Sequence, residues 1–251
     1  MDILTHIDEH IGHIQINRAE RKNALTSAMY QTIADTLKHY DANDDVRVIL
    51  MHGLPDMFCA GNDLQDFLQN PVTDNDAPVV QFLFALRDLK KPLVMAVNGI
   101  AVGVGVTMLM HADYVVAADD SKFQLPFINL ALCPEAGSSL LLTQRAGYLR
   151  AAELLMFGEF FNVTTAHELG IVSRVMPHIE VLRHAQHQAR HLAEKSPAAM
   201  RATKSLLKAH KTDALRAALD AELHAFGTLL QGPDSREAMT AFFEKRKPSF
   251  S

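Results

Sequence analysis

The stretch Asn98-Gly99-Ile100-Ala101-Val102-Gly103-Val104-Gly105-Val106-Thr107 joins an apolar run over 92–97 to a helix that we expect to begin near Gly103. An apolar run, glycines and then a helix are typical of a strand-to-helix connection in an α/β protein. Glycines at a helix start leave backbone N–H groups free, and the helix dipole suits them to an oxyanion or a phosphate. The stretch lacks the third glycine of G-x-G-x-x-G and has no Gly-Lys-Ser/Thr, so it matches neither a dinucleotide fingerprint nor a P-loop. Close packing of the helix against the strand explains the glycines equally well.

Strands and helices alternate on both sides of this stretch. The hydrophobic pattern predicts strands over 3–7, 11–16, 46–51, 92–97 and 113–118. It predicts two helices, one capped by Thr26 with the apolar face Met29, Ile33 and Leu37, and one with the apolar face Val79, Phe82, Leu83 and Leu86. From residue 149 the pattern is helical over 149–157, 179–195, 197–209, 212–230 and 234–246, with a short strand over 170–175. This order predicts an α/β fold with largely parallel sheets and a helical appendage that covers the core or a neighbouring subunit.

Composition and charge exclude several classes of protein. The chain has 251 residues, with 24 Lys and Arg against 29 Asp and Glu, which gives a net charge of −5. This mild acidity argues against a protein that binds nucleic acid through its phosphates. No apolar run approaches the ~18 residues of a membrane helix, and Met1 to Thr5 lack the pattern of a secretory signal. Two cysteines, Cys59 and Cys133, cannot form a disulfide framework, which indicates a reducing compartment. Together these features predict a cytoplasmic protein without nucleic-acid or membrane partners.

A second segment, Phe58-Cys59-Ala60-Gly61-Asn62-Asp63-Leu64, follows the strand over 46–51. Small residues after a buried strand allow a ligand to approach the backbone, and such loops often carry function. The alternative is a tight turn into a helix capped by Asn62 or Asp63.

A third segment, over 123–139, contains Glu135 as its only carboxylate among mostly apolar residues. An apolar environment raises the pKa of a carboxyl group, which suits a general base that works near neutral pH. The alternative is that Glu135 lies in the first turn of a helix, where the dipole favours an acidic side chain.

Two other patterns do not predict a site. His184, His187 and His191 share one face of an expected helix, but the chain has 13 histidines and a chance cluster on a solvated face explains them better than a metal site. Ser138-Ser139 lacks the G-x-S-x-G of a hydrolase nucleophile. We therefore expect neither a metal site nor a serine nucleophile.

Four segments, in this order, resemble the enoyl-CoA hydratase/isomerase (crotonase) superfamily over essentially the whole chain. They are the stretches over 16–25, 58–64, 98–107 and 241–248. The first has Ala19 where proline is usual, and the third has Val104 in place of the middle glycine. The resemblance implies a crotonase-like spiral of β-β-α turns over 1–195 and a helical region over 196–251 for trimerisation and coverage of the CoA site. It also implies a trimer or dimer of trimers and an acyl-CoA thioester substrate, with coenzyme A as part of the substrate and no separate cofactor.

The resemblance also implies roles for particular residues. The oxyanion hole would be the backbone N–H groups of Asn62 and Val104, which stabilise an enolate. The two glutamates of the hydratases map onto Thr107 and Phe127, neither of which can act as an acid or base. Glu135 instead matches the single glutamate of the Δ3,Δ2-enoyl-CoA isomerase branch. The expected activity is therefore a shift of a 3-enoyl-CoA double bond to the 2-position, with hydration of a 2-enoyl-CoA and silent acyl-CoA binding as alternatives.

By the same resemblance, further residues would contact coenzyme A. Arg21, Lys22 and Ala24 would lie near the pantetheine and phosphates, and Ala60, Asp63 and Leu64 near the adenine. Phe242 and Lys245 of the last helix would contact the nucleotide. The loop over 69–78 is expected to border the acyl pocket.

Overall fold

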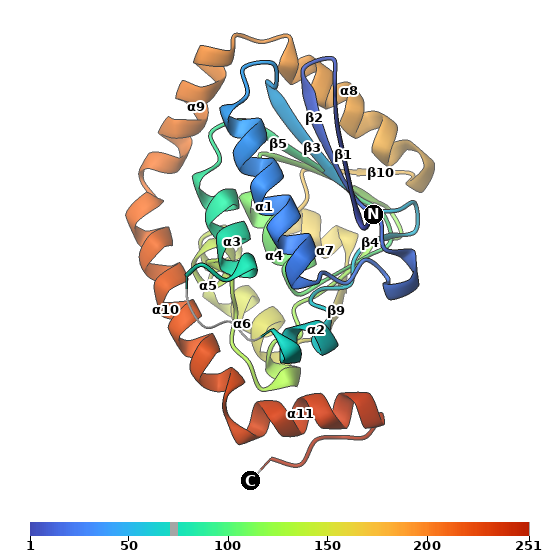
Figure 1. Ribbon diagram of the computed structural model, residues 1–251, viewed down its shortest axis with the longest axis vertical. Helices are drawn as coiled ribbons and strands as arrows, with labels where there is room; N and C mark the ends of the chain where they lie inside the picture. Colours follow the sequence, from blue (N-terminus) through green and yellow to red (C-terminus); the bar gives the residue numbers. More distant parts are fainter. Residues whose placement is uncertain (71–74, 251) are drawn as a thin grey trace.

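The computed structural model describes residues 1–70 and 75–250, and its larger sheet has six strands in the order β1-β2-β3-β5-β7-β10 (Figure 1). Only the β1–β2 pair is antiparallel, and every other neighbouring pair is parallel. The prediction of a largely parallel sheet is therefore confirmed. The strands are β1 (Ile3–Asp8), β2 (Ile11–Ile16), β3 (Val48–His52), β5 (Leu93–Val97), β7 (Tyr114–Ala118) and β10 (Arg174–Met176).

A second sheet of short strands has the order β4-β6-β8-β9. Its strands are β4 (Met57–Cys59), β6 (Ile100–Val102), β8 (Lys122–Gln124) and β9 (Phe160–Asn162). In the chain β4, β6 and β8 follow the long strands β3, β5 and β7, and each pair of strands leads into a helical segment. These helices are α2 (Leu64–Gln69), α4 (Val104–Thr107) and α5 (Ser138–Ala146). Repeated β-β-α units thus build the spiral that the resemblance implied.

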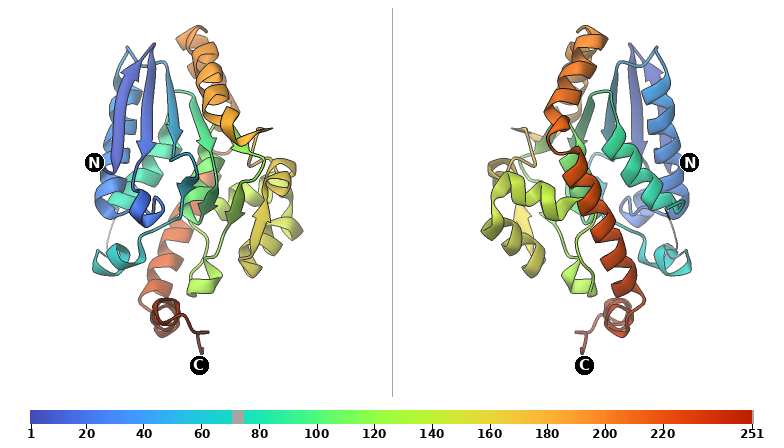
Figure 2. Two further views of the ribbon diagram at one scale, coloured as in Figure 1. Left: turned by 90° about the vertical axis from the view of Figure 1, so that its right-hand side faces the viewer. Right: turned by 90° about the vertical axis from the view of Figure 1, so that its left-hand side faces the viewer.

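The central strands β3, β5 and β7 are buried on both faces, because helices cover both sides of the larger sheet there (Figure 2). Side chains alternate along a strand, so Ile49 and Met51 enter the main core with α1 (Ser27–Ala42) and α3 (Pro78–Asp88). Val48 and Leu50 point to the other face, where they pack against alanines of α8 (Val181–Ala193). The continuous apolar runs of the sequence follow from this double coverage.

The two helices predicted from their apolar faces form as expected. Thr26 caps α1 by accepting a hydrogen bond from the Met29 N–H. All the residues of the two predicted faces are buried: Met29, Ile33 and Leu37 on α1, and Val79, Phe82, Leu83 and Leu86 on α3.

The C-terminal helices extend along the core and end across the bottom of the view in Figure 1. They are α9 (Pro197–Ala209), α10 (Thr212–Leu230) and α11 (Pro233–Glu244). Helix α10 packs against α5, and α11 packs against the short 3-10 helix η3 (Ile128–Leu130). The helical region therefore packs against the core of its own chain, and coverage of a neighbouring subunit stays a prediction.

Short elements account for the differences from the sequence prediction. The helix expected from Gly103 is only α4, continued by the 3-10 helix η2 (Met108–His111), and the strand expected over 170–175 forms only as β10. Strands of three residues such as β4 and β9 are too short to show a period-2 pattern. The remaining elements are α6 (Tyr148–Phe157), α7 (Val163–Glu168), η1 (Ala19–Arg21) and η4 (His178–Glu180).

Candidate active site

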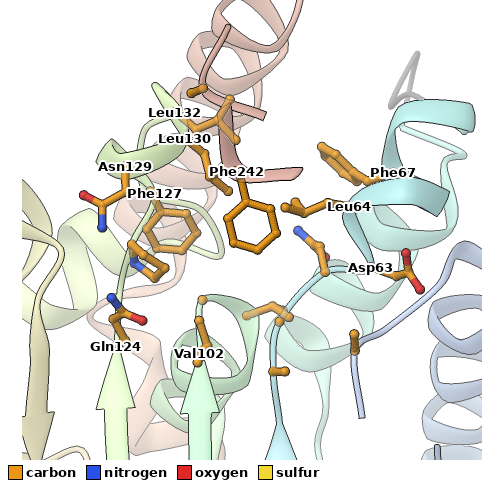
Figure 3. A pocket seen from close by; sticks show the side chains of 18 of the residues that line it. Asp63, Leu64, Phe67, Val102, Gln124, Phe127, Asn129, Leu130, Leu132 and Phe242 are labelled. Carbon is orange, nitrogen blue, oxygen red and sulfur yellow. The ribbon is translucent and has the colours of Figure 1, made fainter. Parts of the chain in front are cut away.

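A cavity of about 650 Å³ opens between the second sheet and the C-terminal helices (Figure 3). Its lining is mostly apolar, and the side chains of Leu64, Phe127 and Phe242 point into it from the α2 segment, the η3 segment and α11. Arg21 and Arg246 also line it. An apolar cavity with a few charged groups at its border is typical of a binding site for an organic ligand.

Two backbone N–H groups reach this cavity from neighbouring parallel strands. Strands β4 and β6 are paired in parallel, so the residues after their carboxyl ends, Asn62 and Val104, lie at the same edge of the second sheet. Leu25 bonds with the backbone of Gly61 and Asp63, which turns the N–H of Asn62 to the opposite side. Within the described part of the chain, neither the Asn62 N–H nor the Val104 N–H donates to a protein acceptor. The pair is thus free to bind an oxyanion.

Glycines shape the two segments that carry these N–H groups. Gly61 and Gly103 precede Asn62 and Val104 with φ of +93° and +54°, a conformation that disfavours any side chain. A Cβ on Gly105 would lie 2.7 Å from the backbone oxygen of Cys59, so glycine lets α4 pack directly on β4. The packing explanation of this glycine-rich stretch is therefore confirmed, and the functional explanation stays a prediction.

Glu135 is buried and is not among the residues that line the cavity. Burial raises the pKa of Glu135 to about 7, opposed by a hydrogen bond from Thr107 and supported by the negative charge of Glu222. The Thr107 hydroxyl is 3.3 Å from Glu135 Oε1 and 3.5 Å from the Val104 carbonyl oxygen, so it can donate its one proton to either acceptor.

The turn around Glu135 is not helical, so the alternative that Glu135 lies in the first turn of a helix is wrong. Helix α5 begins only at Ser138, and Ala136 and Gly137 before it have left-handed φ of +61° and +72°. His111 donates from Nε2 to the Ala136 carbonyl over 2.7 Å. Burial lowers the pKa of His111 to about 4, so it is a neutral donor at pH 7.

Tyr30 is a member of the site that the sequence analysis missed. Its hydroxyl donates a hydrogen bond to Asn62 Oδ1, and burial, with the charge of Glu135, holds the pKa of Tyr30 well above its usual value. Tyr30 lies on the buried face of α1 beside Met29 and Ile33. A tyrosine at a core position needs a partner for its hydroxyl, and this requirement could have indicated it.

Most residues expected to bind substrate line the cavity. Those that do are Arg21, Ala24, Ala60, Asn62, Asp63, Leu64, Val104, Phe127 and Phe242. Thr107 and Glu135 are buried against each other and do not line it. Lys22 and Lys245 are exposed in left-handed turns outside the lining, so their contact with CoA stays a prediction.

Asp63 uses its carboxylate within the protein. It binds Arg18 over 2.8 Å and caps α2 by accepting from the N–H groups of Gln65 and Asp66, and Figure 3 shows it turned away from the centre of the cavity. Of the two expected caps, Asp63 is therefore the one used.

Arg246, the neighbour of Lys245, is a residue of the cavity lining that the sequence analysis missed. Its guanidinium binds Glu237 and Glu244, and the hydrogen bonds that Glu237 accepts from Arg246 and from the Ser249 N–H lower the pKa of Glu237 to about 2. Helix α11 thus carries Arg246 to the rim of the cavity in an ordered position.

The loop over 69–78 falls partly on residues 71–74, which lie outside the described residues. Its described ends, 69–70 and 77–78, line a separate cavity of about 360 Å³ together with Tyr30 and Phe67.

In the described part of the chain no three His, Cys, Asp or Glu side chains could together hold a metal ion. His184 instead lies 3.0 Å from the hydroxyl of Tyr114. No helix in the described ranges is long and apolar enough to cross a membrane.

Comparison with known proteins gives a consistent result over the full length. The model of the family described as "Enoyl-CoA hydratase/isomerase" matches residues 6–251. The chain is 33% identical to 1,2-epoxyphenylacetyl-CoA isomerase of Escherichia coli over 99% of this chain and 98% of that protein. It is 32% identical to 2,3-dehydroadipyl-CoA hydratase of the same organism over 94% of this chain and 93% of that protein. The crystal structure of an enoyl-CoA hydratase/isomerase from Pseudoalteromonas atlantica T6c superposes with a TM-score of 0.96, at 34% identity and full coverage of both chains.

Proposed function

The chain belongs to the enoyl-CoA hydratase/isomerase family, and on that premise we propose that it shifts the double bond of a 3-enoyl-CoA to the 2-position, with Glu135 as the only acid–base group. The observation that carries the proposal is the environment of Glu135. Its carboxyl group is buried beside Thr107, whose hydroxyl also lies 3.5 Å from the Val104 carbonyl, and its pKa is raised to about 7. A base with this pKa is half ionised at neutral pH, which suits proton transfer in both directions.

The proposed reaction needs one base and two N–H donors. The Glu135 carboxylate takes a proton from C2, and the electrons of that C–H bond form a dienolate across the thioester. The N–H groups of Asn62 and Val104 bind the oxygen on which charge develops, and each such donor is worth about 10²–10³ in rate. The same carboxyl group then returns the proton to C4, so the substrate and product contain the same atoms.

Hydration would need a different set of groups. Addition of water requires acid–base side chains that orient the water and deliver its proton. The positions that resemble those of the hydratase glutamates hold Thr107 and Phe127. Thr107 is buried, and the Phe127 ring lies 4.0 Å from where a Cβ on Gly103 would stand. These side chains make the neighbourhood poor in water, which favours proton transfer over hydration.

The cavity fits the coenzyme A part of such a substrate. Arg21 and Arg246 at its border can pair with phosphates, and the exposed ring of Phe242 can stack on a base. The E. coli relative named as an isomerase supports this assignment, and the relative named as a hydratase keeps hydration as the second candidate.

The test compares the wild type with Glu135→Gln on a 3-enoyl-CoA and on a 2-enoyl-CoA, followed by the absorbance of the conjugated thioester. We expect the wild type to form the conjugated product and the variant to lose about 10²–10⁴-fold in kcat, the range of general acid–base catalysis. The control is Glu168→Gln, which removes an exposed carboxylate far along the chain on α7. Loss of the 2-enoyl absorbance independent of Glu135 would instead establish a hydratase, and turnover of neither substrate would favour silent binding.

An isotope experiment tests the single-carboxylate route. With deuterium at C2 of the 3-enoyl-CoA, part of the label should appear at C4 of the product, because the buried carboxyl group exchanges slowly with water. Complete release of the label into water would contradict a shuttle by one buried group.

A further inference from the structure

Helix α10 carries a second buried carboxylate, that of Glu222, which contacts the turn following Glu135. The Glu222 side chain is 7% exposed, and its Oε2 accepts a hydrogen bond from the Gly137 N–H over 2.6 Å. Its Oε1 accepts from the Ser139 N–H over 2.9 Å and from the Ser139 hydroxyl. Glu222 therefore caps α5, a helix more than eighty positions earlier in the chain.

The capped turn has a conformation that its own residues do not favour. Ala136 and Gly137 are both left-handed, and a β-carbon makes this conformation costly at Ala136. Two side chains from outside the turn hold it: His111 donates to the Ala136 carbonyl, and Glu222 accepts from the Gly137 N–H. Strained backbone of this kind persists only where surrounding groups over-determine it.

We propose that Glu222 is a positioning residue for Glu135: by capping α5 and fixing the Ala136–Gly137 turn, it sets where the base lies, so that α10 of the C-terminal region completes the active site. This inference rests on the proposed role of Glu135. It gives the helical region a task in catalysis in addition to the contact that α11 makes with the cavity.

Glu222 also dominates the charge near Glu135. The other titratable groups that interact with Glu135 are Tyr30 of α1, Cys59 of β4 and Cys133 before the turn. Burial raises the pKa of Cys59 to about 12, that of Cys133 to about 11 and that of Tyr30 well above its usual value, so all three are neutral at pH 7. Burial raises the pKa of Glu222 itself, while its bonds from Ser139 and Gly137 lower it and favour the charged form. Two like charges disfavour each other, so ionised Glu222 makes Glu135 harder to ionise.

The first experiment compares Glu222→Gln with Asp220→Asn, which removes a charge from the exposed face of the same helix. For Glu222→Gln we expect kcat to fall about 10–100-fold, since small misplacements of catalytic groups have effects of this size. The acid limb of the kcat–pH profile should move to lower pH, because the like charge is gone. KM should change less than about twofold, since Glu222 lies outside the cavity lining. Asp220→Asn should match the wild type.

A second readout does not depend on turnover. The carboxyl resonance of Glu135, labelled with carbon-13 and assigned by its loss in Glu135→Gln, should titrate at lower pH in Glu222→Gln than in the wild type. If the wild type catalyses no double-bond shift but this titration moves, the proposed function fails and the interaction of Glu222 with Glu135 stands. If the wild type is active and Glu222→Gln changes neither the profile nor the titration, the inference is overturned.

A milder variant covers the case in which Glu222→Gln does not fold. Ser139→Ala removes only the hydroxyl that donates to Glu222 and keeps the charge. We expect a fall in kcat of about threefold to tenfold, the worth of one hydrogen bond, without a shift of the profile. An unchanged kcat in folded Ser139→Ala would contradict the positioning role.

Discussion

Glu135 carries an energetic cost, because its burial disfavours the charged form that a base needs. Its pKa in the folded protein, about 7, lies above the ordinary value of 4.5. The favourable contribution of the neutral carboxyl group is therefore fully present below pH 4.5 and is lost as the pH rises through 7. Catalysis and stability make opposite demands on this side chain.

Glu135→Gln should accordingly stabilise the protein at pH 8 but not at pH 5. Glutamine keeps the shape of the side chain without the buried charge, and the shift corresponds to a gain on the order of 3 kcal/mol at alkaline pH. Urea unfolding of the wild type and the variant at both pH values measures it. A difference that does not depend on pH would show that Glu135 is not buried as described.

Tyr30 should affect both stability and kcat through its hydrogen bond to Asn62. Tyr30→Phe leaves the half-buried Asn62 Oδ1 without its donor, and the loss of one such hydrogen bond costs about 0.5–1.5 kcal/mol. Because the same residue offers an oxyanion N–H, kcat should also fall, by about tenfold. Tyr114→Phe is the matched control, since it removes a hydroxyl that contacts His184 on the other side of the sheet. Equal effects of the two variants on kcat would contradict the link to Asn62.

At the level of elements, the contact of α4 with β4 depends on Gly105. A Cβ there would lie 2.7 Å from the backbone oxygen of Cys59, which cannot rotate away as a side chain could. Gly105→Ala should therefore push α4 from the sheet, destabilise the protein by about 1–3 kcal/mol and lower kcat by displacing the Val104 N–H.

The control for this prediction is Gly227→Ala on α10. A Cβ there meets nothing within 4 Å, so alanine should stabilise the helix by about 0.5–1 kcal/mol. Thermal unfolding of both variants should show shifts of opposite sign. A stable and fully active Gly105→Ala would disprove the close contact.

At the level of the whole molecule, the C-terminal region returns to the cavity and provides its outer wall. Phe242 points into the cavity from α11 (Figure 3), although its side chain is 60% exposed. Phe242→Ala should therefore raise KM for an acyl-CoA about tenfold while kcat changes little, because Phe242 lines the cavity and Glu135 does not.

Phe250→Ala is the matched control, because Phe250 is also half exposed near the C-terminus but does not line the cavity. It should leave both constants unchanged. A loss of kcat without a change in KM in Phe242→Ala would mean that α11 acts on the chemistry rather than on binding.

The sequence determined those features that have a local physical cause. Period-2 and period-3.6 patterns reflect which side of one strand or helix is buried, so the long strands and the apolar faces of α1 and α3 could be read directly. The glycines around Asn62 and Val104 are needed for left-handed or close backbone contacts, and they marked both segments as candidates for an oxyanion site. The roles of Thr107, Phe127 and Glu135 came instead from the resemblance of these segments to a known family.

Only the tertiary structure decided what depends on residues far apart in the chain. Tyr30 meets Asn62, and Glu222 meets Gly137 and Ser139, through packing of helices that no local pattern specifies. The pKa of Glu135 follows from the same packing, because burial is a property of everything around the group. Helix propensity could not show that Glu135 lies in a left-handed turn rather than in α5, since the bonds that hold that turn come from η2 and α10.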